Sequence, residues 1–285
     1  FPLDLIIHIH HLLFLIKYYC YPERKGRNVM RFAIIDRGDE NSRLKAAYLI
    51  SLLSERGWTE NRTNPDLVLC IGGDGTILRA IHEYMDQLDQ LSFIGIHTGT
   101  LGFFTDFTED ELVSMLECLK SKPSMEEYSL IEAFFPETGN TLYALNEIRL
   151  ESISQTLSLD ITIDGDYFEK SNGSGICVST QAGSTAINRS LNGAIIDEGL
   201  SVLQLVEIMP IAHRNHHTLR NPYVMRKDRV IELRSEPMRE VICSYDNLKY
   251  KLQGETQVVI RLSEHRVRFA RFRPYSYLRR LKNLF

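Results

Sequence analysis

The stretch Gly72-Gly73-Asp74-Gly75-Thr76 follows directly on the run Asp66-Leu67-Val68-Leu69-Cys70-Ile71. A short apolar run that ends in a turn predicts a buried strand of a parallel sheet. Three glycines within four residues predict a sharp turn whose backbone can approach a ligand with no Cβ in the way. Bare amides suit a phosphate, but Asp74 among them would repel it. We therefore expect the carboxylate to serve a metal ion or to accept a proton.

Strands and helices alternate on both sides of this glycine turn. Further strands are expected at 31–36 and 92–96. Asn41-Ser42 can cap a helix that would end at Gly57. The capping box of Thr108 and Glu111 predicts a second helix after it. A third helix is expected from about Ile77 to Leu88. This pattern predicts an α/β domain with a parallel sheet over residues 30–124, whose ligands bind beyond the carboxyl ends of the strands.

After Pro123 the pattern becomes mostly β. Asp164-Gly165 is typical of a hairpin turn, and only Gly199–Met209 is expected to be helical in this part. We expect a mostly-β C-terminal domain over residues 125–272 and a closing helix over 273–285. The expected strands lie at 129–135, 141–150, 157–163, 175–180, 229–234, 240–244, 248–252, 256–262 and 266–272.

Composition narrows the class of protein. The chain has 285 residues, with 44% hydrophobic and 25% charged residues, as in globular proteins. A net charge of −4 argues against a broad nucleic-acid surface. The cysteines are scattered without a Cys-x-x-Cys spacing, which indicates a reducing, cytoplasmic environment and argues against zinc. They are Cys20, Cys70, Cys118, Cys177 and Cys243.

Residues 1–29 differ from the rest of the chain. The apolar run Leu5–Ile16 is shorter than the roughly 20 residues that a membrane-spanning helix needs. Codons made only of purines can encode Glu23–Arg27, as a translated ribosome-binding site would, just upstream of Met30. We interpret residues 1–29 as a non-native leader, with a disordered natural extension as the alternative.

Two further motifs carry polar groups. Asn146-Glu147 lies inside a strand pattern, where an amide and a carboxylate can satisfy the paired hydroxyls of a ribose or simply face solvent. The stretch 179–186, Ser-Thr-Gln-Ala-Gly-Ser-Thr-Ala, can form a floor for a flat base or sugar, or an ordinary turn.

The Gly-Gly-Asp-Gly-Thr turn resembles that of a kinase superfamily that contains NAD kinases, diacylglycerol and sphingosine kinases, and phosphofructokinases. The order and spacing of all three motifs, with His97–Phe103 between the first two, resemble the NAD kinase family. Arg268–Pro274 is similar to its bacterial members, and the resemblance spans about Met30 to Phe285. The lipid kinases are less similar, because their loop runs directly into an Asn-Glu pair.

The resemblance implies an NAD kinase/diacylglycerol kinase-like fold and a role for each matching residue. Asp74 would be the catalytic carboxylate near the 2′-hydroxyl of the adenosine ribose, and no residue is assigned as a protein metal ligand. The nucleotide and phosphate sites implied are Gly72, Gly73, Gly75 and Thr76 for phosphates, Phe103 beside the nucleotide, Asn146 and Glu147 for ribose hydroxyls, Thr185 and Ala186 for the bases, and Asp246 and Asn247 near the active site.

The chain departs from the family pattern in the dinucleotide site. Ser174 stands where the family has Asp, Gln181 and Ala182 replace Pro and a hydroxyl residue, and Ile187 replaces Tyr. Losing a carboxylate and an aromatic face should weaken or reshape dinucleotide binding by about 1–3 kcal/mol each.

Two sets of residues have structural interpretations that are favoured over functional ones. His213, His216 and His217 lack nearby carboxylates for a metal site, so a loop at a subunit contact or pocket rim is favoured over a metal centre. The arginines of 266–273 alternate in part with apolar residues, which favours a half-buried strand with a solvated basic face over a phosphate site.

The implied activity is phosphorylation of NAD to NADP with ATP or polyphosphate, with Mg²⁺ or another divalent cation. The alternatives are a lipid or other small-molecule kinase with the same turn, and a catalytically weak nucleotide-binding paralogue. The resemblance implies a homodimer or homotetramer, and no nucleic-acid or membrane partner is expected.

Overall fold

The computed structural model describes residues 29–99, 101–211 and 218–284. By internal contacts the chain divides into two compact units. Unit 1 comprises the chain up to Glu127 together with Arg268 onward, and unit 2 is Tyr128–Val267. Except for Val29, the stretch interpreted as a leader lies outside the described residues, as do His213, His216 and His217.

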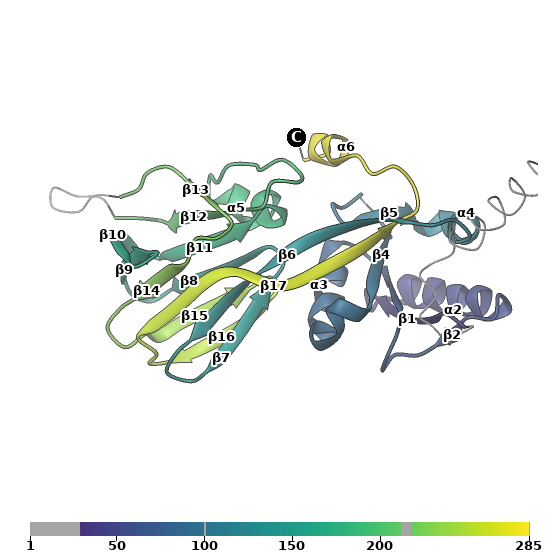
Figure 1. Ribbon diagram of the computed structural model, residues 1–285, viewed down its shortest axis with the longest axis horizontal. Coiled ribbons are helices and arrows are strands. Elements are labelled where there is room, and N and C mark those ends of the chain that lie inside the picture. Colours follow the sequence, from purple (N-terminus) through teal and green to yellow (C-terminus); the bar gives the residue numbers. More distant parts are fainter. Residues whose placement is uncertain (1–28, 100, 212–217, 285) are drawn as a thin grey trace, which may run out of the picture. The chain divides into compact units, whose positions relative to one another are not determined.

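Unit 1 is built on a parallel sheet in the order β2-β1-β3-β4-β17, with β5 also paired to β4. One face of the sheet shares a core with α2 and α4, in which Leu49, Leu53 and Met115 are fully buried. Figure 1 shows α2 beside β1 and β2. On the other face, a Cβ on Gly95 of β4 would stand 2.8 Å from Ile77 of α3, so glycine lets that helix pack closely.

The elements of unit 1 are short and follow one another through brief connections. They are β1 (Arg31–Asp36), α2 (Glu40–Glu55), β2 (Thr59–Glu60), β3 (Leu67–Ile71), α3 (Asp74–Glu83), η1 (Met85–Gln90), β4 (Ser92–His97), β5 (Thr105–Thr108), η2 (Glu109–Glu111), α4 (Leu112–Cys118) and α6 (Tyr277–Lys282).

The helix ends refine the expectations from sequence. Asp39, not Asn41-Ser42, caps α2, because its Oδ1 accepts the Ser42 amide at 3.0 Å. The capping box of Thr108 and Glu111 is present. Helix α3 begins at Asp74, three residues before Ile77, so the acidic residue of the glycine turn belongs to the first helical turn.

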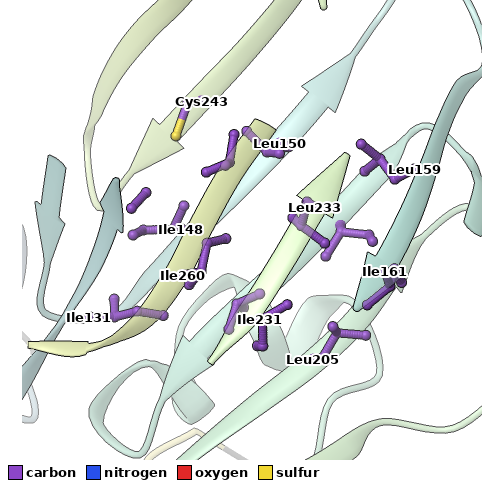
Figure 2. Packing of buried hydrophobic residues seen from close by; sticks show 14 of the residues in the cluster. Ile131, Ile148, Leu150, Leu159, Ile161, Leu205, Ile231, Leu233, Cys243 and Ile260 are labelled. Carbon is purple, nitrogen blue, oxygen red and sulfur yellow. The ribbon is translucent and has the colours of Figure 1, made fainter. Parts of the chain in front are cut away.

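Unit 2 is a sandwich of two sheets. One has the order β10-β9-β14-β17 and continues through β6 to β7, and the other has the order β13-β12-β11-β8-β15-β16. Figure 2 shows side chains of both sheets meeting in one core, with Ile161 and Ile231 from the first and Ile148 and Leu205 from the second. The strands alternate buried and exposed residues as a sandwich requires; in β9, Leu157, Leu159, Ile161 and Ile163 are buried.

The strands of unit 2 include two that also supply residues to unit 1, β6 and β17. The set is β6 (Ser124–Phe135), β7 (Asn140–Ala144), β8 (Glu147–Ser152), β9 (Leu157–Ile163), β10 (Asp166–Gly173), β11 (Gly175–Thr180), β12 (Val202–Ile208), β13 (Tyr223–Arg226), β14 (Ile231–Arg234), β15 (Arg239–Tyr245), β16 (Leu248–Gln253) and β17 (Gln257–Arg271). Two short helical segments, η3 (Ala182–Thr185) and α5 (Ile187–Ser190), complete the unit.

Three expectations for this part are wrong. Gly199–Met209 is not a helix but contains β12, because its run from Val202 to Ile208 pairs on both sides within the sandwich. The strand expected over 141–150 is two strands, β7 and β8, that belong to different sheets. The two strands expected over 256–272 are the single strand β17.

The expected hairpin at Asp164-Gly165 is present. Both residues have positive φ, 53° and 87°, and Ile163 pairs with Asp166.

The expected fold class, an α/β part with a parallel sheet and a mostly-β part, is confirmed. Within the described ranges, no helix has the length and hydropathy needed to cross a membrane.

Candidate active site

The glycine turn lies at the carboxyl end of β3, where a parallel sheet binds its ligands. A Cβ on Gly72 would stand 2.2 Å from the Thr76 hydroxyl oxygen, so a glycine is required there by packing. Gly73 is the N-cap of α3. At Gly73 and Gly75, by contrast, an added Cβ would meet no described atom within 4 Å. The turn therefore has one packed glycine, and two whose backbone faces open space beside the first helical amides.

Asp74 is held by the segment between β4 and β5. The Phe103 amide donates to Asp74 Oδ2 at 2.8 Å, and the Phe104 amide donates to Oδ1 at 3.1 Å. A Cβ on Gly102 would stand 2.3 Å from Asp74 Oδ1. Two hydrogen bonds thus fix both the position and the rotation of the carboxylate, and the absence of a Cβ at Gly102 leaves room for it.

The charge state of Asp74 is set by opposing effects. Burial raises the pKa of Asp74 above its ordinary value, and the hydrogen bonds from Phe103 and Phe104 oppose that rise. Arg280 and Arg271 also act to lower the pKa. A fixed carboxylate with a raised pKa is a better proton acceptor than an ordinary aspartate.

In unit 2, the bend between β7 and β8 carries Asn146-Glu147. Asp246 is the residue that shapes this bend, since its carboxylate accepts the Leu145 amide at 2.9 Å and the Asn146 amide at 2.7 Å. The Thr180 hydroxyl donates to the Leu145 carbonyl at 2.6 Å. A Cβ on Gly183 would stand 2.0 Å from the Asn146 carbonyl oxygen. We call these residues the Asn146 cluster: Leu145, Asn146, Glu147, Ser179, Thr180, Gly183 and Asp246.

Three buried polar atoms of the Asn146 cluster have no hydrogen-bond partner within the described chain. They are Asn146 Oδ1, Glu147 Oε2 and Ser179 Oγ. Buried polar atoms are normally paired, so this cluster has unused capacity for a ligand that carries hydroxyl groups. Ser179 was not singled out as a site residue from sequence. The sequence pointed to Ser179 only through its place in the 179–186 motif. In the structure, the pairing of β11 with β8 sets Ser179 opposite Glu147.

Glu147 has an unusual charge state. Burial, with the nearby Asp246 carboxylate adding to it, raises the pKa of Glu147 to about 8, and Arg149 opposes the rise. At neutral pH the folded protein therefore holds Glu147 mainly in its protonated form, which can donate as well as accept a hydrogen bond.

The remaining residues singled out from sequence are more dispersed. Thr185 ends η3, and Ala186 and Ile187 lead into α5, directly after Gly183 of the cluster. Asn247 lies exposed in the turn between β15 and β16, next to Asp246. Ser174 precedes β11 and its carbonyl accepts the Ser152 amide. It lies at the opposite end of β11 from Thr180, so the fold of unit 2 does not bring Ser174 to the Asn146 cluster.

Among the described residues, no group of three or more His, Cys, Asp or Glu side chains could hold a metal ion by itself. Asp74 is the carboxylate of the glycine turn. A divalent cation that the phosphates of a nucleotide already hold needs only one or two protein carboxylates. The residues present fit that mode of binding.

Unit 1 thus presents a carboxylate fixed by two backbone amides, and unit 2 presents buried oxygens that have no partner within the described chain. Residues 12–121 match the ATP-NAD kinase N-terminal domain, and residues 145–272 match the ATP-NAD kinase C-terminal domain. The chain belongs to the NAD kinase family, which confirms the resemblance seen in its motifs.

Relatives support the same family, and solved structures share the fold. NAD kinase 1 of Bacillus cereus (strain ATCC 10987 / NRS 248) is 33% identical over 90% of this chain and 98% of the relative. NAD kinase of Lactobacillus gasseri is 37% identical over 83% of this chain and 90% of the relative. The fold is similar to yeast NADH kinase complexed with NADH, at TM-score 0.78, 17% identity and coverage of 93% and 92%. It is also similar to an NAD kinase from Archaeoglobus fulgidus in complex with ATP, at TM-score 0.69, 23% identity and coverage of 90% and 97%.

Proposed function

We propose that this protein transfers the terminal phosphoryl group of ATP to the 2′-hydroxyl of the adenosine ribose of NAD and so makes NADP. The family and the curated relatives, which are NAD kinases that align over most of their length, support the reaction. The observation that carries the chemistry is the Asp74 carboxylate. Two backbone amides hold it in the glycine turn at the carboxyl end of β3.

The roles follow from the charges. As the 2′-oxygen forms its bond to the terminal phosphorus, the bond from that phosphorus to the bridging oxygen breaks and ADP leaves. The hydroxyl proton passes to Asp74, which must be ionised to accept it. Amides near Gly73 and Gly75 offset the negative charge on the phosphates, and Thr76 completes the phosphate site together with Gly72. Phe103 borders the nucleotide.

A Mg²⁺ ion brought by ATP would neutralise phosphate charge in this reaction. Asp74 is the residue that would contact it, because it is the acidic residue within the glycine turn. Both oxygens of Asp74 already accept an amide, which leaves further lone pairs on each oxygen for a cation or a hydroxyl.

In unit 2, the Asn146 cluster would hold ribose hydroxyls. Asn146 Oδ1 and Glu147 Oε2 are suited to accept from them, because both atoms are buried and without a partner in the described chain. Thr185 and Ala186 would contact the bases. Asp246 and Asn247 would act from the turn after β15, and Ile187 would tune dinucleotide affinity. Ser174 lies at the other end of β11 from the Asn146 cluster, so it would act on a part of the dinucleotide outside that cluster.

The proposal extends to the phosphate donor, the oligomeric state and the compartment. Polyphosphate would be an alternative donor. The protein would work as a homodimer or homotetramer in the cytoplasm, without a nucleic-acid or membrane partner. Free thiols at Cys70, Cys118, Cys177 and Cys243 support a reducing compartment.

An assay that couples NADP formation to an NADP-specific dehydrogenase tests the proposal. Wild-type protein should form NADP from NAD, ATP and Mg²⁺, and Asp74→Asn should reduce turnover by about 10³-fold or more while remaining folded. Asp39→Asn is the matched control, since Asp39 also accepts a backbone amide at the start of a helix.

Near-normal turnover by Asp74→Asn would refute the assigned role of Asp74. A silent assay with wild-type protein, together with NAD binding in calorimetry, would instead identify a non-catalytic nucleotide-binding paralogue. Phosphorylation of another acceptor in a substrate panel with labelled ATP would identify a different small-molecule kinase.

A further inference from the structure

The segment from Gly102 to Thr105 is held from behind by the C-terminal part of unit 1. Each of its four carbonyls accepts a hydrogen bond from a side chain of residues 271–280. The bonds join Gly102 O to Arg280 Nε at 3.1 Å, Phe103 O to the Tyr275 hydroxyl at 3.2 Å, Phe104 O to Arg271 Nη1 at 3.1 Å and Thr105 O to Arg280 Nη2 at 2.6 Å.

Two of these bonds involve peptide groups that also bind Asp74. The Gly102 carbonyl and the Phe103 amide belong to the same planar peptide group. Arg280 therefore donates to one end of that group while its other end donates to Asp74 Oδ2 at 2.8 Å. The next peptide group repeats the arrangement, because Tyr275 donates to the Phe103 carbonyl and the Phe104 amide donates to Asp74 Oδ1 at 3.1 Å.

This arrangement affects both orientation and strength. A rigid peptide plane that is bonded at its carbonyl cannot turn its amide away from Asp74 without breaking that second bond. A carbonyl that accepts a hydrogen bond also polarises its own peptide group, which makes the amide a stronger donor. Each oxygen of Asp74 thus depends on one C-terminal side chain, Oδ2 on Arg280 and Oδ1 on Tyr275.

The two C-terminal side chains are themselves fixed. The Arg280 guanidinium lies 4.0 Å from the Tyr275 ring centroid, and Arg271 lies 4.5 Å from it. Arg280 and Arg271 both pair with the buried Asp106, at 3.1 and 2.9 Å. Arg280 is 6% exposed, although α6 as a whole is short and its other arginine, Arg279, is exposed.

We infer that Arg280 and Tyr275 are positioning residues for the reaction, which act on the Asp74 carboxylate through the two peptide groups between Gly102 and Phe104. The inference rests on the proposed role of Asp74. It assigns the C-terminal segment a part in turnover that requires no contact with either substrate.

Tyr275→Phe is the most selective test, because it removes the hydroxyl and keeps the ring against the two guanidiniums. We expect kcat to fall by about three- to tenfold, the scale of one lost hydrogen bond, with KM for NAD and ATP nearly unchanged. Arg280→Met should lower kcat by about 10²-fold, the scale of a small misplacement of a reacting group. Arg279→Met, one residue away with the same charge change, should retain wild-type kcat.

The same substitutions made in Asp74→Asn protein distinguish a positioning role from a general loss of structure. In Asp74→Asn protein, whose residual turnover is measured at high enzyme concentration, neither Tyr275→Phe nor Arg280→Met should lower the rate further, because both act through Asp74. If Arg280→Met fails to fold, Tyr275→Phe decides the matter alone.

The possible failures are distinct. Three results would overturn the inference and leave the proposed function intact. They are a wild-type kcat in Tyr275→Phe, a change in KM alone, or a decrease in kcat by the same factor in the wild-type and Asp74→Asn backgrounds. Near-normal turnover by Asp74→Asn itself would overturn the role of Asp74, and the positioning role with it.

Discussion

Gly102 leaves the space that the Asp74 carboxylate occupies. A Cβ at Gly102 would stand 2.3 Å from Asp74 Oδ1 and 2.7 Å from its Cγ, closer than any real Cβ contact. The next two residues supply the amides that hold the same carboxylate. A single turn of chain therefore both makes room for Asp74 and binds it.

Gly102→Ala should consequently damage turnover more than stability. The methyl group would push the carboxylate off its two amides, and we expect kcat to fall by about 10²-fold, the effect of a misplaced catalytic group. Gly99→Ala is the comparison, because a Cβ there would meet no described atom within 4 Å. Steady-state NADP formation by both variants checks this prediction. Equal activity of the two would show that the contact is relieved without moving Asp74.

The pH dependence of turnover should show the raised pKa of Asp74. Burial raises this pKa, so the carboxyl takes up its proton at a higher pH than an ordinary aspartate does. A protonated Asp74 cannot accept the hydroxyl proton, so kcat/KM for NAD should fall as pH decreases, and the midpoint of this fall should lie above the ordinary pKa of 3.8. The measurement is kcat/KM for NAD, which reports the ionisation of the free enzyme, with circular dichroism to confirm the fold at each pH. A midpoint at or below the ordinary value would contradict the assignment.

Asp246→Asn should raise the KM for NAD. An asparagine can accept only one of the two amides that Asp246 now binds, and its own NH₂ group would face the other. The Asn146 bend should shift, and we expect about a tenfold rise in KM for NAD with kcat less affected.

Asp164→Asn is a matched control for that variant within unit 2. Asp164 also has a positive φ, 53° against 50° for Asp246, lies in a hairpin turn and accepts a backbone amide, that of Val230. It should lose a little stability and keep its KM for NAD. A comparable rise of KM in both variants would mean that the effect comes from sandwich stability rather than from the Asn146 bend.

Glu147→Gln should change how stability depends on pH. The pKa of Glu147 is raised from 4.5 to about 8, so between those values the folded protein holds a proton that the unfolded chain releases. Because the unfolded state binds fewer protons, the contribution of Glu147 to the free energy of unfolding is greatest below about pH 4.5 and is lost as pH rises through about 8. Glutamine stays neutral, so the variant should gain stability relative to wild type as the medium becomes alkaline.

Urea unfolding at about pH 5 and about pH 9 measures this difference. Glu264→Gln, at an exposed position of the same unit, provides the baseline. An unchanged stability difference between Glu147→Gln and wild type at the two pH values would show that Glu147 is ionised in the folded protein.

Much of the fold could be predicted from local patterns. The strand before Gly72 and the run from Phe32 to Ile35 are continuous apolar stretches, and only a doubly covered parallel sheet buries such runs completely. The hairpin at Asp164-Gly165 follows from two residues that tolerate positive φ. Gly199–Met209 could not be predicted in this way, since its apolar run fits a buried strand or a helix equally and pairing with β11 and β13 decides the outcome.

The sequence by itself determined that a glycine turn with one acid follows a buried strand, and its spacing from Asn146-Glu147 indicated the family. Only the tertiary structure decided what controls that acid. The groups that hold Asp74 come from Phe103 and Phe104, and the groups behind them come from Tyr275 and Arg280, more than 170 residues further along the chain. Backbone amides and carbonyls are the same in every residue. No pattern of side chains could therefore show that these particular ones would meet at Asp74.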